Sequence, residues 1–258
     1  MNRRGFLSRG LVGASALGLS GCKVLDSANN RDTLLRKTME NVGALSYRTQ
    51  RLLGGGHTLA REYAQSDIRQ GQRPNGSTNP DSDAYLALAA DGFASYSLTV
   101  TGLVATPLTL SFAALKAMPA RTQITRHDCV EGWSCIAKWT GVPLGQVLDL
   151  AQPGLTARFA VFHCYDRLGG GLSAPDPYYE SIDLIDAYHP QTILAYAVND
   201  APLPVANGAP LRLRVERQLG YKMAKYVHTI ELVDSFASFG KGHGGYWEDK
   251  GYEWYAGI

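Results

Sequence analysis

Residues 126–134 are the stretch from which the rest of the sequence is best interpreted, and they read Arg126-His127-Asp128-Cys129-Val130-Glu131-Gly132-Trp133-Ser134. A predicted strand at residues 122–126 comes directly before them, so Cys129 is expected at a strand-to-loop junction, where a side chain can face a cleft. Chemistry alone leaves four interpretations of Cys129 open. It can be a buried apolar cysteine, a disulfide partner of Cys135, or a single thiolate ligand to a soft metal. It can also be a nucleophilic thiolate assisted by His127 or His163.

The spacing of the cysteines excludes several familiar metal and redox sites. The chain has four, Cys22, Cys129, Cys135 and Cys164. No pair has the C-x-x-C spacing of a zinc ribbon or a thioredoxin site, and no C-x-x-C-H run offers covalent haem attachment. Any metal must therefore be held in another way.

The composition is that of a globular protein without a strong charge bias. The 258 residues are 45% hydrophobic and 19% charged, which suits one large domain or two small ones. With 25 basic and 23 acidic residues the formal net charge is +2, which gives no indication of a nucleic-acid partner.

The N-terminus reads as an export signal. Arg3 and Arg4 precede Phe6-Leu7 in a twin-arginine pattern, and the uncharged residues 11–21 are too short and too weakly apolar for a membrane-spanning helix. The run Leu19-Ser20-Gly21-Cys22 resembles a lipobox. We therefore expect residues 1–22 to direct the protein to the periplasm by the twin-arginine route, with lipid anchoring at Cys22 as one outcome and an incidental cysteine as the other.

Patterning predicts an extension followed by one α+β domain. Residues 23–70 are polar and are expected to form an N-terminal extension or tether, and residues 71–258 to form the domain. Residues 96–103 alternate apolar and polar side chains, as in a half-buried strand. Further strands are predicted at 159–165, 193–198, 211–215 and 226–233, and short helices at 112–118, 144–150 and 181–187. Because irregular stretches separate these strands, mixed sheets are favoured over a doubly wound parallel sheet.

Five further motifs follow residues 126–134. They are Trp139-Thr140-Gly141-Val142-Pro143-Leu144, Gly169-Gly170-Gly171-Leu172 with Ala187-Tyr188-His189-Pro190, Leu203-Pro204-Val205-Ala206-Asn207-Gly208-Ala209-Pro210-Leu211-Arg212, and Gly220-Tyr221-Lys222-Met223-Ala224-Lys225. Together with residues 126–134, and in this order, these motifs resemble those of the sulfite-oxidase-like molybdopterin-dependent oxidoreductases, especially the periplasmic methionine-sulfoxide reductase branch. The resemblance covers roughly residues 70–235. The resemblance implies a mixed-sheet, sulfite-oxidase-type molybdopterin-binding domain.

The resemblance also implies a cofactor and the residues that hold it. In this family one cysteine joins the two dithiolene sulfurs of the pterin on molybdenum, and Cys129 occupies that place. The cofactor-binding residues implied are Asn75, Cys164, Asn207, Arg212, Met223, Ala224 and Lys225. Cys164 departs from the pattern, because the sulfoxide-reducing relatives have a threonine there. Taken singly, Asn207-Gly208 is also an ordinary turn, Arg212 a surface charge of a sheet and Lys225 a solvated strand residue.

The substrate and the partners are less closely defined. The position of the relatives' active-site tyrosine falls near Lys250 or Tyr252, and Tyr252 is the candidate, within an aromatic tail that can equally serve to seal the core. The arginines of the sulfite-oxidising branch have no aligned counterparts, since Arg73 is one residue out of register. Both sulfoxide reduction and sulfite-type oxidation stay open.

We expect an oxidoreductase acting on a small molecule and supplied by a separate electron carrier, a cytochrome or a membrane haem subunit, because the chain has no haem motif. A monomer is expected, since the chain ends at Ile258, where sulfite oxidases continue into a dimerisation sandwich. The alternatives are a cofactor-bearing electron-transfer or binding protein without turnover, and a cysteine hydrolase using Cys129 and His127.

Overall fold

The computed structural model describes residues 30, 32–54, 57–68, 71–169 and 175–258, in two compact units, residues 1–52 and 53–258. The predicted twin-arginine signal and Cys22 lie outside the described residues. Helix α2 (Leu34–Gly54) is preceded by Thr33, whose hydroxyl accepts a hydrogen bond from the amide of Arg36 at 3.2 Å. None of the helices described is both long and apolar enough to cross a bilayer.

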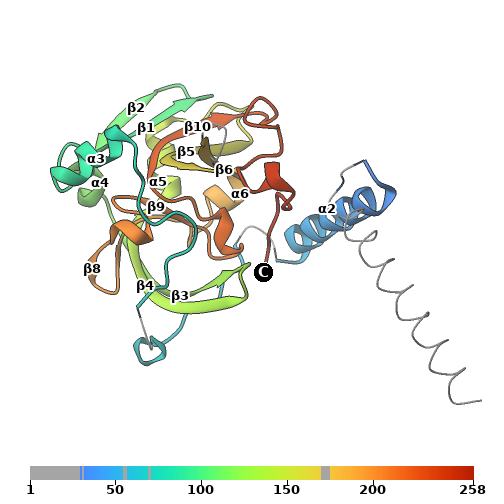
Figure 1. Cartoon of the computed structure of the whole chain (residues 1–258), viewed down its shortest axis with the longest axis horizontal. Helices are drawn as coiled ribbons and strands as arrows, with labels where there is room; N and C mark the ends of the chain where they lie inside the picture. The colour runs from blue at the N-terminus through green and yellow to red at the C-terminus, as the bar shows by residue number, and fades with distance from the viewer. Residues whose placement is uncertain (1–29, 31, 55–56, 69–70, 170–174) are drawn as a thin grey trace, which may run out of the picture. The chain divides into compact units, whose positions relative to one another are not determined.

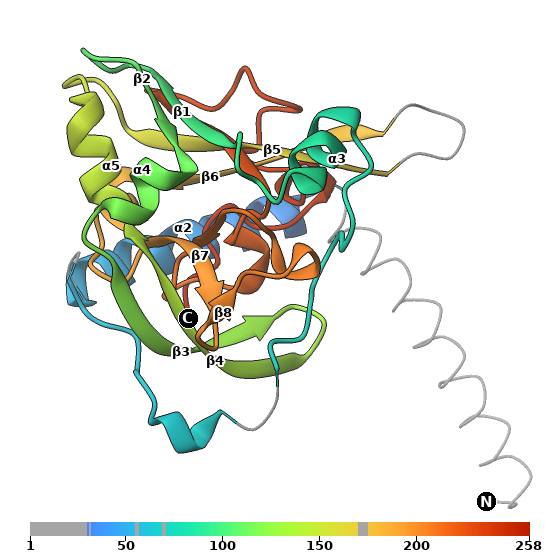
Figure 2. The same ribbon diagram turned by 90° about the vertical axis from the view of Figure 1, so that its left-hand side faces the viewer.

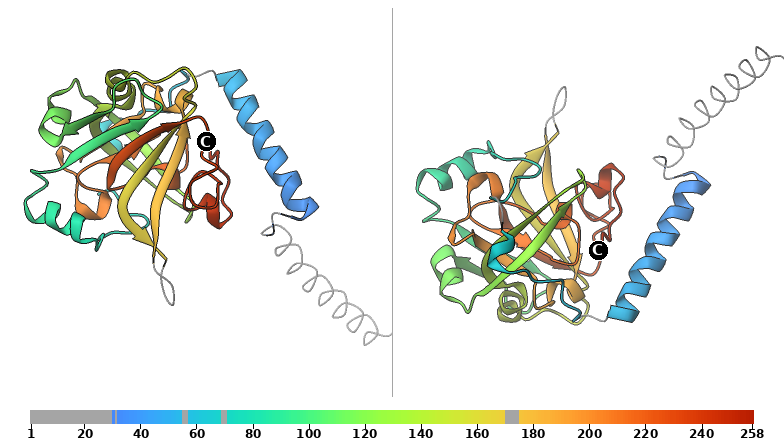
Figure 3. Two further views of the ribbon diagram at one scale, coloured as in Figure 1. Left: turned by 90° about the horizontal axis from the view of Figure 1, so that it is seen from above. Right: turned by 90° about the horizontal axis from the view of Figure 1, so that it is seen from below.

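The larger unit contains a five-stranded mixed sheet in the order β2-β1-β10-β5-β6. Its strands are β1 (Ser97–Gly102), β2 (Leu108–Ser111), β5 (Phe159–Leu168), β6 (Asp176–Asp183) and β10 (Val227–Val233). The pair β1 and β10 is parallel, and the other neighbours are antiparallel. Figure 3 shows these strands side by side in this order, with the chain after β10 returning beside β6. The expected α+β class with a mixed sheet is confirmed.

A second, antiparallel sheet has the order β3-β4-β7-β8, with β9 also pairing with β7. Its strands are β3 (Arg121–Cys129), β4 (Trp133–Pro143), β7 (Ile193–Val198), β8 (Ala201–Pro202) and β9 (Arg212–Arg214). In Figures 1 and 2 the β3–β4 hairpin curves along the opposite side of this unit from β1 and β5. Cys129 is the last residue of β3 and stands next to the turn of this hairpin.

Short helices connect the strands. They are α3 (Asp83–Ala90), α4 (Phe112–Ala117), α5 (Leu144–Ala151) and α6 (Leu184–Ala187), with the 3₁₀ turns η1 (Gln65–Asp67), η2 (Val205–Asn207), η3 (Gly220–Lys222) and η4 (Glu248–Lys250). Ser111 caps α4 as predicted, accepting from the amide of Ala114 at 3.1 Å. The helix predicted at 181–187 is wrong in its first part. Residues 181–183 belong to β6, because Asp183 is the helix cap and accepts from the amide of Asp186 at 2.7 Å.

The main hydrophobic core joins the two sheets. It includes Leu98 of β1, Phe162 of β5 and Ile230 of β10, together with Val142 of β4 and Leu213 of β9. The alternation predicted for residues 96–103 is seen in β1, where Leu98 and Val100 are fully buried. Because both sheets share this core, the end of β3 is held in a fixed position relative to β5 and β6.

Candidate functional site

Cys129 lies at the last position of β3 and opens into a cleft. It pairs with Trp133 across the hairpin, whose turn includes Gly132 at a φ of +85°. The Cys129 side chain is 8% exposed, and burial raises the pKa of its thiol. It forms no disulfide, so the pairing with Cys135 is wrong. In the β3–β4 register Cys135 stands opposite His127 rather than Cys129, and its sulfur contacts the carbonyl of Gly71.

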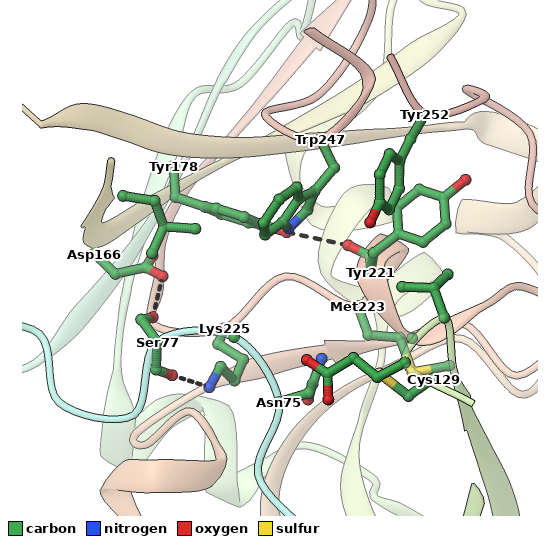
Figure 4. A pocket seen from close by; sticks show the side chains of 15 residues that line it. Asn75, Ser77, Cys129, Asp166, Tyr178, Tyr221, Met223, Lys225, Trp247 and Tyr252 are labelled. Carbon is green, nitrogen blue, oxygen red and sulfur yellow. Dashed lines mark hydrogen bonds between the residues drawn. The ribbon is translucent and has the colours of Figure 1, made fainter. Parts of the chain in front are cut away.

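The cleft in front of Cys129 is built from segments far apart in the sequence (Figure 4). It encloses about 620 Å³ including its open mouth. Its walls come from the loop 75–77, the β3–β4 turn, β5, β6, η3 with the residues after it, and the C-terminal tail. The lining residues are Asn75, Gly76, Ser77, Cys129, Val130, Glu131, Asp166, Leu168, Tyr178, Gly220, Tyr221, Met223, Lys225, Trp247 and Tyr252. Four of the predicted site residues besides Cys129 are thus brought together here, namely Asn75, Met223, Lys225 and Tyr252.

Arg212, Asn207 and Lys225 meet beside this cleft. The Arg212 guanidinium is fully buried, stacks over Trp139 at 5.0 Å and donates to the carbonyl of Asn207 at 2.9 Å. Burial and the nearby Arg214 lower the pKa of Arg212 to about 9. The Arg212 Nε and Nη2 atoms have no hydrogen-bond partner within the part of the chain described. Arg212 is therefore a cation with two free donors, not a surface charge.

Lys225 is also a buried cation. Its Nζ donates to the carbonyl of Ser77 and, at 3.1 Å, to that of Ala206. Burial and the charge of Arg212 lower the pKa of Lys225 to about 7. Two cations that disfavour each other's charge form a natural site for an anion. The solvated-strand interpretation of Lys225 is wrong, since its side chain is 6% exposed.

Gly208 allows these two side chains to approach. Its φ is +111°, and a Cβ placed there would lie 2.9 Å from the Lys225 Cβ and 3.1 Å from the Arg212 Cβ. Any side chain at this position would therefore separate the two cations or strain the turn. The Asn207-Gly208 pair is a turn as well as part of the site.

The remaining predicted residues lie in different surroundings. Ala224 belongs to the main core, and its carbonyl accepts from the amide of Leu213 at 2.8 Å. Cys164 is buried and lines a separate cavity together with His163 and His228, not the cleft of Cys129. Tyr252 lines the cleft, is 37% exposed and stacks on Trp247 at 5.5 Å. It therefore contributes to the wall and is accessible from the mouth.

His127 is poorly placed to assist a nucleophile. The Arg214 guanidinium donates to its Nδ1 at 3.0 Å and is itself paired with Glu216 at 2.6 Å. Burial and the charge of Arg214 lower the pKa of His127 well below its ordinary value. Among the described residues no hydrogen bond joins His127 to Cys129, and His163 lines the other cavity. The geometry gives no support to a cysteine hydrolase.

Sequence reasoning missed several residues of the cleft, including Ser77, Asp166 and Tyr178. The sequence pattern could have indicated Asp166. In the strand predicted at 159–165, Phe162 and Cys164 fall on one face, and Asp166 continues that face at an expected core position. A carboxyl group on the buried face of a strand is unusual enough to indicate a site.

A buried ionic cluster stands behind the aromatic wall of the cleft. The Lys222 Nζ donates to Glu180 and, at 2.5 Å, to the Oε1 of Glu248, and all three side chains are fully buried. Although burial by itself lowers the pKa of Lys222, the two carboxylates raise it overall. Because Lys222 follows Tyr221 and Glu248 follows Trp247, the cluster ties the C-terminal tail to η3 and β6.

The residues fit a pterin cofactor that carries a phosphate and a metal. Free donors on buried Arg212 suit phosphate oxygens, and the Oδ1 atom of half-buried Asn75, which is itself buried and has no partner among the described residues, suits a ring N–H. No group of three or more His, Cys, Asp or Glu side chains capable of holding a metal occurs among the described residues. One protein thiolate, such as that of Cys129, would suffice for a metal that arrives on a dithiolene.

The fold and this cleft together define a cofactor-binding oxidoreductase domain of the α+β class. Residues 86–238 match the family described as the oxidoreductase molybdopterin binding domain, and the chain belongs to that family. It is an oxidoreductase that binds a molybdenum cofactor, and the family predicted from the sequence is confirmed.

Two proteins show how far the likeness extends. A putative protein-methionine-sulfoxide reductase subunit of Azospira oryzae, named YedZ1, is 34% identical over 255 residues, 99% of this chain and 87% of the relative. The crystal structure of the sulfane dehydrogenase SoxCD from Paracoccus pantotrophus matches with a TM-score of 0.48 and 22% identity. That match covers 54% of this chain and 38% of the other.

Proposed function

We propose that this chain is the catalytic subunit of an exported molybdenum enzyme that reduces sulfoxides, with Cys129 as the protein ligand of the metal. One observation carries the proposal: the fold brings Cys129 into one cleft with Asn75 and Lys225, beside the free donors of Arg212. When bound, the cofactor would supply the two-electron redox chemistry of the reaction. Arg212, Asn207 and Lys225 would hold its phosphate.

The walls of the cleft favour a sulfoxide over sulfite. Sulfite is an anion and would need cations facing the substrate. Among the described residues, Lys225 is the one Lys or Arg that lines this cleft, and it already donates to two carbonyls. Arg73 is within electrostatic reach of Cys129, but its guanidinium lies over the Trp133 ring at 5.0 Å. Aromatic rings of Tyr221, Trp247 and Tyr252 face the same space in Figure 4. Rings of this kind make favourable contacts with a thioether sulfur and its methyl group. The relative of Azospira oryzae, named as a sulfoxide reductase subunit, supports the same substrate class.

The proposed reaction also requires an electron donor, and the N-terminal sequence suggests where in the cell it takes place. Conversion of a sulfoxide to a thioether and water consumes two electrons and two protons, which another molecule must supply. We propose a separate electron carrier, a cytochrome or a membrane haem subunit, and a monomeric chain. The relative of Azospira oryzae is named as a subunit, which supports a partner. Export through Arg3 and Arg4 to the periplasm, with Cys22 as a lipid anchor, completes the proposal.

A direct assay tests the substrate class. Purified protein from a molybdenum-competent host should oxidise a reduced viologen dye when a peptide containing methionine sulfoxide is added, and dye oxidation is followed by absorbance. Sulfite with ferricyanide as acceptor should give no turnover, because the lysine in the described lining of the cleft, Lys225, already donates to two carbonyls. Turnover with sulfite and none with sulfoxides would refute the assignment.

The phosphate role of Arg212 is tested by cofactor retention. Arg212→Gln removes the charge and the fork of donors, and each lost charge-assisted bond is worth about 1.5–3 kcal/mol, or roughly 10- to 100-fold in affinity. We expect the pterin to dissociate from the variant roughly 10- to 100-fold faster than from the wild type during gel filtration. The pterin that remains bound is measured by fluorescence of its oxidised form. Arg158→Gln, at an exposed arginine outside the cleft, is the control and should retain the cofactor. Equal retention by both variants would contradict the role.

A further inference from the structure

Helix α2, drawn in blue in Figure 1, has an apolar face that is exposed along its whole length. At about 100° of rotation per residue, its leucine, valine and methionine side chains fall within an arc of about 140° around the helix axis. Each of these side chains is between 39% and 84% exposed. They are Leu34, Leu35, Met39, Val42, Leu45 and the pair Leu52-Leu53. A helix with a face of this width normally buries that face against another apolar surface.

The opposite half of α2 carries the charged side chains. Four basic residues stand there with a single acidic residue, Glu40. Glu40 lies about opposite the centre of the apolar face and is paired with Arg36 at 3.1 Å. Lys37 and Arg48 are exposed and lie together along one edge of the apolar face. The side of the helix that would meet a bilayer is therefore bordered by cations, and its acidic group points away.

This charge pattern favours a lipid surface over a second helix as the occupant of the apolar face. A coiled-coil partner needs only a narrow apolar seam, usually with charges of both signs on its two sides. Here the arc is wide, and the basic residues at its edge suit the phosphates of anionic lipids. The Thr38 hydroxyl, which lies within the apolar arc, donates to the carbonyl of Leu34 at 2.8 Å. That donor is already paired within the helix, so placing it in an apolar layer costs little.

The position of α2 in the chain agrees with a membrane contact. Residues 23–33 separate the helix from Cys22, the proposed lipid anchor. A segment of this length spans at most about 40 Å. A chain anchored at Cys22 therefore keeps α2 within reach of the same bilayer surface.

We propose that α2 is a membrane-surface helix. It lies flat on an anionic bilayer, with the apolar face around Val42 inserted at the headgroup boundary and with Lys37 and Arg48 against lipid phosphates. This contact holds the oxidoreductase domain beside a membrane, where a membrane-bound electron donor can reach it. The inference goes beyond the proposed reaction and requires neither the cofactor, nor the substrate, nor acylation of Cys22.

Binding to lipid vesicles tests the proposal. The protein used is the processed chain, residues 22–258 carrying Cys22→Ser, so that neither the export signal nor an acyl chain contributes to binding. We expect it to co-sediment with vesicles of phosphatidylethanolamine and phosphatidylglycerol, and much more weakly with vesicles of phosphatidylcholine alone. Val42→Glu places a carboxylate at the centre of the apolar face and should weaken binding to the anionic vesicles about 10-fold or more.

Ala44→Glu is the matched control, because it adds the same charge two residues away, at an exposed position on the charged half of α2. It should weaken binding by less than about 5-fold, the effect of one charge near an anionic surface. Replacing both Lys37 and Arg48 by Gln should remove most of the preference for anionic vesicles. All variants should keep the thermal unfolding midpoint of the parent chain, and Leu45→Glu repeats the test on the same face if Val42→Glu does not.

Three results would overturn the proposal. The first is a parent chain that does not bind anionic vesicles. The second is an equal loss of binding for Val42→Glu and Ala44→Glu, because the apolar face would then make no contact with the lipid. The third is a parent chain that sediments as a dimer without binding vesicles and becomes a monomer on Val42→Glu, because a second copy of the chain would then cover this face.

Discussion

Cys129→Ser should remove molybdenum from the purified protein while leaving much of the pterin bound. Cys129 is the cysteine that lines the cleft, and a serine hydroxyl is a far poorer ligand for a soft metal than a thiolate. Removing a residue that only hydrogen-bonds to a metal ligand already lowers metal affinity by about 10- to 100-fold. Removing the ligand itself should lower it at least as much. The pterin keeps its contacts with Arg212 and Lys225, which do not depend on the sulfur.

The measurement is the ratio of molybdenum to pterin to protein, together with the visible absorption of the thiolate-to-metal bond. Cys135→Ser and Cys164→Ser are matched controls, since both cysteines are buried and free but lie outside this cleft. Both controls should keep the metal. A Cys129→Ser protein with a full complement of molybdenum would show that the thiolate is not the ligand.

Lys222→Met should cause the largest loss of stability. The variant leaves Glu180 and Glu248 buried against each other without their shared cation, and breaking a buried ion pair costs about 3–5 kcal/mol. We expect the free energy of unfolding in urea to fall by about that amount. The tail that carries Trp247 should loosen at the same time, because Glu248 no longer ties it to η3.

The pH dependence of this loss has a defined sign. Burial and Glu248 raise the pKa of Glu180 well above its ordinary value, and removing the lysine raises it further. A carboxyl group whose pKa is raised in the folded state lowers the free energy of unfolding at a pH above that pKa. This loss declines as the pH falls through the folded-state pKa. Lys222→Met should therefore regain stability on going from about pH 8 to about pH 5.

Two comparisons make the result specific. Lys222→Met combined with Glu248→Gln should recover part of the loss, because one of the two opposed carboxylates is gone. Lys250→Met removes an exposed lysine paired with Asp176 and should leave the unfolding midpoint almost unchanged. A loss for Lys222→Met no larger than that of Lys250→Met would show that the cluster does not hold the fold together.

Much of the fold was predictable from local patterns. Alternation in residues 96–103 indicated β1 because a half-buried strand exposes every second side chain, and Ser111 indicated the start of α4 because its hydroxyl replaces a missing backbone partner. Strand β6 was missed because Asp176-Pro177-Tyr178-Tyr179-Glu180-Ser181 does not alternate. Its side chains are buried on both faces, by the core and by the returning tail.

The sequence by itself determined the family and the mixed α+β class, because short motifs in a fixed order carry that information, and it predicted Cys129 as the metal ligand. Only the tertiary structure decided which residues share a cleft. It separated Cys164 from Cys129, buried Lys222 between two carboxylates and placed Asp166 in the wall of the cleft. The physical reason is that these contacts join residues far apart in the chain. The pairing of strands and the packing of the two sheets set the distances between these residues. The local pattern of side chains predicts neither the pairing nor the packing.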